Sequence, residues 1–200
     1  MPGYSDRIAH ALAFTAKHAP HRGGGSAVVR AASTAIILSR YECDEPTIVA
    51  GILYLAVEDV AAIERRPLER KIHDKFGSIV MAVISELLEP AAPPLSKERA
   101  WEACRREQLA RLAVAEPRAL DIWAAVEIHH CGTLLADLRR LGAEYFPTIS
   151  NLNPRQALWW YRALAEALAA HEAWPRRSML EELNALRHAL QLELNLESQA

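Results

Sequence analysis

The chain has 200 residues and a mass of 22.3 kDa, which is the size of one ordinary domain. Hydrophobic residues make up 51% of the chain and charged residues 24%, a balance that excludes a disordered tail and a collagen-like repeat. The 23 Lys and Arg residues nearly cancel the 25 Asp and Glu residues, which leaves a net charge of −2. Because no overall basic excess exists, we expect neither a nucleic acid nor a membrane as a partner.

The cysteines and the N-terminal sequence indicate the cellular compartment. Cys43, Cys104 and Cys131 are odd in number, and no two of them show the spacing of a zinc knuckle, so we interpret them as reduced thiols. The first residues, MPGYSDRIAH, lack the layout of a signal peptide, and no apolar run approaches the ~18 residues that span a bilayer. We therefore expect a cytoplasmic protein.

Glycine and proline stand mostly in short clusters between long Ala- and Leu-rich stretches. This pattern predicts an all-α fold, a helical bundle of about 8 to 10 helices, with one domain over residues 1–200. The predicted helices cover, in chain order, residues 6–18, 27–40, 45–60, 68–77, 78–88, 96–115, 117–142, 155–174 and 178–197.

The third predicted helix carries no charge from Pro46 to Val57 and is apolar almost all round, which favours a place at the centre of the bundle. Glu58 and Asp59 follow directly. Carboxylates at the end of a buried helix are expected to face a cavity or to pair with a buried cation. Bases predominate over residues 1–40, whereas residues 41–64 hold acids and no base. The acids at positions 42, 44, 45 and 64 are interpreted as surface charges that these bases neutralise.

Two apolar features near the C-terminus allow two interpretations. Met179, Leu183, Leu186 and Leu190 form a stripe on the last predicted helix, which either packs on the body of the domain or forms a homodimer seam. We favour packing. The aromatic segment 159–161, Trp-Trp-Tyr, is predicted to belong to the core because paired tryptophans on a helix seldom stay exposed.

The segment DEPTIVAGILYLAVEDV, followed by FG at residues 76–77 and by SIVMAVISELL, resembles the HD-domain phosphohydrolases of the RelA/SpoT type, which hydrolyse (p)ppGpp. The resemblance continues upstream in AHALAFTAKHAPHRGGGSAVVRAASTAIIL and downstream in ALDIWAAVEIHHCGTLLADLRRLG. The later ALWWYRALAEAL is similar to the closing helix of the small stand-alone alarmone hydrolases. The resemblance covers about residues 5–170 and implies an HD-domain fold, with residues 178–197 as a C-terminal helix.

The resemblance implies a site for a divalent ion, usually manganese, held by a histidine, an adjacent His-Asp pair and a later aspartate. The four corresponding positions hold Arg30, Tyr54, Leu55 and Val126. None of these offers the imidazole or carboxylate that such an ion requires, so we expect no metal cofactor. Arg30 instead brings a permanent positive charge.

The resemblance also implies roles for two acids, because Glu58 and Asp59 match the acidic pair that positions the attacking water. We therefore predict that Arg30 pairs with Glu58 or Asp59, and that this pair of acids is not sufficient for catalysis without the metal.

The same resemblance implies that this chain retains part of a nucleotide-binding surface. His21 and Arg22 match a basic pair that holds the guanine base, and Thr133 matches a threonine near the ribose. His129 matches a histidine of the family, whereas His130 replaces an asparagine. The alternative interpretation of these side chains is an ordinary polar rim. The predicted ligand-binding residues are His21, Arg22, Arg30, Tyr54, His129, His130 and Thr133.

These observations lead to three hypotheses. The first is a catalytically inactive HD-domain homologue that binds a guanine nucleotide or a protein partner, in alarmone signalling. The second is an active phosphohydrolase that cleaves a (p)ppGpp-like nucleotide with a non-standard site. The third is a structural or interaction protein that uses the C-terminal helix.

Overall fold

The computed structural model describes residues 5–19, 27–58, 60, 62–88, 97–150 and 152–194. Within these ranges all regular structure is helical, which confirms the all-α prediction. The helices are α1 Asp6–His18, α2 Ala27–Arg40, α3 Glu45–Val57, α4 Ala62–Phe76, α5 Ser78–Leu87, α6 Lys97–Leu112, α7 Pro117–Leu141, α8 Phe146–Ile149, α9 Pro154–Ala169 and α10 Arg177–Glu193, with a 3₁₀ turn at Ala143–Tyr145.

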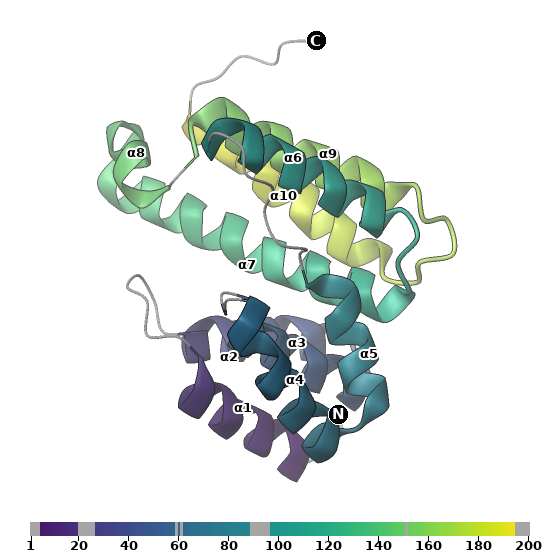
Figure 1. Ribbon diagram of the computed structural model, residues 1–200. Helices are drawn as coiled ribbons and strands as arrows, with labels where there is room; N and C mark the ends of the chain where they lie inside the picture. The colour runs from purple at the N-terminus through teal and green to yellow at the C-terminus, as the bar shows by residue number, and fades with distance from the viewer. Residues whose placement is uncertain are drawn as a thin grey trace.

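Helices α1 to α5 form one group and α6, α9 and α10 form another, with the long helix α7 between them (Figure 1). Helix α3 packs against α1, α2, α5 and α7, whereas α10 packs against α7 and α9. Helix α7 therefore contacts both groups of helices, and different residues of α7 face each group. No helix in the described part of the chain is long and apolar enough to cross a membrane.

Helix α3 is the central helix, as predicted. Every residue from Thr47 to Val57 is buried. The carboxylate of Asp44 accepts a hydrogen bond from the Thr47 backbone N–H and caps the helix. Gly51 allows α2 to approach closely, because a Cβ atom at this position would lie 2.8 Å from Leu38 Cδ1.

The predicted C-terminal stripe packs inside the protein. Met179, Leu183 and Leu190 are 0% exposed, and Leu186 is partly buried against the same core. Trp160 and Tyr161 are also buried, so the preferred interpretation of both apolar features is confirmed.

The structure corrects several predicted helix boundaries. Helix α4 begins six residues earlier than predicted and contains Pro67, which removes one backbone N–H from the second turn. The guanidinium of Arg65 donates to the Val60 carbonyl just before this helix. The predicted loop around Pro147 contains the 3₁₀ turn and the short helix α8. Helix α9 ends at Ala169 instead of near Trp174.

The segment between α9 and α10 is fixed by a buried acid of α7. Trp174 Nε1 donates a hydrogen bond of 2.8 Å to Asp121 Oδ1, and Arg176 Nη1 lies 3.3 Å from Asp121 Oδ2. The Arg176 guanidinium also donates to the carbonyl oxygen of Tyr41, beyond the end of α2. Asp121 thus joins the second group of helices to the first.

Candidate functional site

The predicted ion pair between the first forty residues and the end of the central helix is present. Arg30 of α2 places its Nη2 atom 2.6 Å from Oε1 of Glu58, the residue that follows α3. The side chain of Arg30 is 25% exposed and that of Glu58 is 15% exposed. This half-buried contact confirms the pairing of Arg30 with Glu58; Asp59, the other predicted partner, lies outside the described residues.

Helix α7 brings two histidines to the same place. The ring centroids of His129 and His130 are 5.9 Å apart, and the charge of Arg30 acts on both rings. The carboxylate of Glu58 also acts on His130. The structure therefore gathers four residues of the predicted site from three segments of the chain.

Glu127 was not predicted. It is only 7% exposed, although it is an acid in the middle of α7. Its Oε2 atom lies 3.8 Å from Nδ1 of His130, and the charge of Arg105 in α6 acts on it from the opposite group of helices. A single acid within the apolar sequence IWAAVEI is the same kind of signal that drew attention to Glu58. We call Arg30, Glu58, Glu127, His129 and His130 the Arg30 cluster.

The two histidines of the Arg30 cluster have opposite electrostatic environments. Burial lowers the pKa of His129, and the positive charges of His130 and Arg30 lower it further. Burial by itself would lower the pKa of His130, but Glu127 and Glu58 outweigh it and raise that pKa. Burial by itself would raise the pKa of Glu127, yet His130 and Arg105 hold it below its ordinary value.

The side chains at the positions implied for a metal do not fit a divalent ion. Tyr54, Leu55 and Val126 are 7%, 1% and 5% exposed, and they offer a phenol and two hydrocarbon groups. The fourth position, Arg30, is a cation that contacts Glu58. Among the described residues no group of three or more His, Cys, Asp or Glu side chains is placed to hold a metal.

The remaining predicted ligand-binding residues are placed as follows. Thr133 is exposed on α7, one helical turn beyond His129 and His130. Tyr54 is buried in α3, and its carbonyl oxygen accepts a hydrogen bond from the backbone N–H of Glu58. His21 and Arg22 lie outside the described residues.

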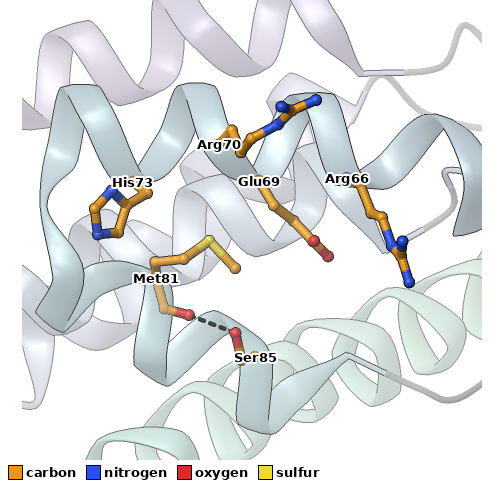
Figure 2. Close-up of a pocket in the computed structure, with 6 residues that line it drawn as sticks. All are labelled: Arg66, Glu69, Arg70, His73, Met81 and Ser85. Carbon is orange, nitrogen blue, oxygen red and sulfur yellow. Dashed lines mark hydrogen bonds between the residues drawn. The ribbon is translucent and has the colours of Figure 1, made fainter.

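A separate groove of about 590 Å³ lies between α4 and α5. Figure 2 shows that its polar groups do not converge, because Arg70 points away from α5 while Glu69 lies near the middle of the groove. The wall formed by α5 contributes only Met81 and Ser85. This groove has no arrangement of groups for catalysis, and we place the candidate site at the Arg30 cluster.

The sequence and structure were compared with known proteins. A model of the HD domain family matches residues 9–139, which include α2, α3, nearly all of α7 and the five residues of the Arg30 cluster. The chain belongs to the HD domain family. The resemblance to the RelA/SpoT-type hydrolases implies that Tyr54 and Leu55 take the positions of the His-Asp pair that gives the family its name.

Two solved structures share the fold. One is described as a metazoan ortholog of SpoT that hydrolyses ppGpp and plays a role in starvation responses; it is 20% identical, with a TM-score of 0.70, and the match covers 97% of this chain and 99% of the other. The second is a protein of Listeria monocytogenes EGD-e, 16% identical with a TM-score of 0.65, covering 84% of this chain and 99% of the other. No curated protein matches the sequence.

Proposed function

We propose that this HD domain is a metal-free, non-hydrolytic member of its family that binds a guanine nucleotide of the (p)ppGpp type at the Arg30 cluster, in alarmone signalling. The observation that carries the proposal is the ion pair of Arg30 with Glu58 at 2.6 Å. The resemblance matches Arg30 to a histidine that holds the metal ion in those hydrolases, so the Arg30 guanidinium lies close to where the charge of that metal would be. Here the guanidinium supplies the positive charge that the nearby carboxylate requires.

The loss of hydrolysis follows from the chemistry that a guanidinium lacks. A bound metal lowers the pKa of its water and so generates a nucleophile near neutral pH. Arg30 has no open coordination position, and its guanidinium stays protonated, so it activates no water. Glu58, occupied by Arg30, is a poor candidate for positioning one.

The choice of ligand rests on the retained polar side chains and on the fold. His129, His130 and Thr133 stand on one stretch of α7, and the chain shares its fold with a protein that hydrolyses ppGpp. A protein partner at the same surface is the competing form of this proposal. A seam made by the C-terminal stripe is disfavoured, since Met179, Leu183 and Leu190 are already buried in the fold.

Two assays distinguish the non-hydrolytic nucleotide-binding protein from an active phosphohydrolase and from a domain that binds a protein partner. A hydrolysis assay on guanosine tetraphosphate with added manganese is expected to give no turnover, and turnover would establish the active phosphohydrolase instead. Thermal shift with guanosine tetraphosphate and GDP is expected to raise the melting temperature, because a ligand at 100 times its Kd adds about 2.7 kcal/mol of stability. No shift with either nucleotide would overturn the nucleotide-binding form and leave the protein partner.

A further inference from the structure

Glu127 is a buried charge that the proposed function does not use. The residue lies in the middle of α7 and is 7% exposed. A carboxylate in such a place costs free energy unless a cation accompanies it. Its neighbours include His130 on the same helix, whose Nδ1 atom lies at 3.8 Å, Arg105 on α6, and the Trp160 side chain on α9, which hydrogen-bonds to it.

The two ring nitrogens of His130 are placed differently with respect to Glu127. Nδ1 faces Glu127, and Nε2 lies on the other edge of the imidazole, from which a protonated ring donates a second hydrogen bond. The side chain of His130 is 36% exposed, against 9% for that of Glu127. One edge of the ring therefore faces a buried acid while the ring itself remains accessible.

The charges around His130 come from every helix of the cluster. Arg30 of α2 and Glu58 at the end of α3 act on its ring, as does Glu127 of α7, and Arg105 of α6 acts on Glu127. Protonation of His130 would place three cations, Arg30, Arg105 and His130, beside the two carboxylates Glu58 and Glu127 among these described residues. Such an excess of positive charge favours an anion.

We propose that Glu127 is a positioning residue, which holds His130 as an imidazolium whose Nε2–H donates a hydrogen bond to a phosphate or carboxylate of the bound ligand. The inference rests on the proposed function, because it identifies His130 as the side chain that contacts the phosphate or carboxylate of the proposed ligand. The metal positions of this HD domain hold no metal ligands. In their place, Glu127 and His130 together provide a cationic hydrogen-bond donor.

The protonation part is tested without any ligand, by an NMR titration of the His130 imidazole in the full chain. We expect the pKa of His130 to lie above 6.5, the ordinary value, and to fall in Glu127→Gln. The matched control is Asp137→Asn, which removes a half-buried acid that pairs with Arg140 on the same helix and is expected to leave the pKa of His130 unchanged. A wild-type pKa at or below 6.5, or equal effects of the two variants, would overturn the role of Glu127. The wild-type value decides even if Glu127→Gln fails to fold.

The ligand part is tested by calorimetry with inorganic pyrophosphate. We expect binding at pH 6 that weakens by at least about tenfold in Glu127→Gln and in His130→Asn, the loss of one charge-assisted hydrogen bond, and that is unchanged in Asp137→Asn. Equal affinity in all four proteins would overturn the donor role of His130 while leaving nucleotide binding intact. If pyrophosphate does not bind the wild type, the donor role fails, and the thermal shifts with guanine nucleotides decide separately whether the proposed function also fails.

Discussion

The contact between Arg30 and Glu58 has a natural control within the same chain. Arg106 and Glu102 lie at the same 2.6 Å separation, but their side chains are 71% and 53% exposed, against 25% and 15% for Arg30 and Glu58. Burial reduces screening by water and fixes the side chains at a lower cost in entropy. The two pairs should therefore differ in energy although they do not differ in distance.

We predict this difference for double-mutant cycles with Gln replacements, measured by urea unfolding. The coupling energy of Arg30 with Glu58 is expected to be about 1–2 kcal/mol, and that of Arg106 with Glu102 at most about 0.5 kcal/mol. Equal coupling energies for the two pairs would show that Arg30 contributes no more than an ordinary surface contact.

At this scale, the sequence predicted the partner of Arg30 but not the whole cluster. The uncharged run of α3 indicated that the acid after it needs a cation, the family resemblance identified Arg30 as that cation, and the contact with Glu58 confirms the pairing. Glu127 gave a similar signal, but its partners come from α6 and from its own helix. The position of α6 depends on how the two groups of helices pack, and no local pattern specifies that packing.

At the scale of elements, Asp44 links the start of α3 to the start of α7. Its carboxylate accepts hydrogen bonds from the Thr47 N–H and from Arg118. Burial by itself would raise the pKa of Asp44, but the hydrogen bonds from Arg118 and Thr47 outweigh it and lower that pKa to about 2.

This shift predicts a pH dependence. An aspartate in the unfolded chain titrates near a pKa of about 3.9, so the charge of Asp44 stabilises the fold above about pH 4 and loses that effect as the pH falls towards about 2. In Asp44→Asn the side-chain oxygen still caps α3, but the charge is absent. Urea unfolding should show a deficit for the variant at pH 7 that disappears by pH 2, and a deficit that stays constant with pH would contradict the assignment.

The segment between α9 and α10 yields a second prediction at this scale. Trp174→Phe removes the donor to Asp121, and both residues are 2% exposed. We expect a loss of about 2–4 kcal/mol in the free energy of unfolding, from the lost hydrogen bond and the space left by the smaller ring. Trp159→Phe, at a partly buried position, is the control and should cost less. An equal loss in the two variants would show that Asp121 does not depend on Trp174.

Helix types and their order were predictable, whereas several ends were not. Ser5, Asp44 and Pro46 gave true start signals. The end of α9 was misplaced because the sequence up to Trp174 continues a helical pattern, while the buried hydrogen bond to Asp121 draws Trp174 out of it. Helix α4 begins before its predicted start and continues through Pro67, a residue that is rare inside helices.

At the scale of the whole molecule, α7 lies between the two groups of helices (Figure 1) and contributes Glu127, His129 and His130 to the Arg30 cluster. The family resemblance predicted this bundle, and the HD domain match over residues 9–139 confirms it. Function is less predictable at this scale, because a retained fold can host a changed site.

The bundle should accept a metal if the ligands are restored. The variant Arg30→His, Tyr54→His, Leu55→Asp and Val126→Asp introduces carboxylates at positions that are 1% and 5% exposed in the wild type. Without metal these buried charges are expected to lower the melting temperature, and manganese should raise it again by binding only the folded state. A variant that folds but shows no stabilisation by manganese would contradict the placement of the four positions.

The proposed replacement of the metal by Arg30 is tested most directly by titrating manganese into the wild-type protein in a calorimeter, with the restored variant as the positive control. The ion pair of Arg30 with Glu58 predicts no binding at the site in the wild type and about one equivalent in the variant. One equivalent of manganese bound by the wild type, lost when Glu58 is changed to Gln, would contradict it.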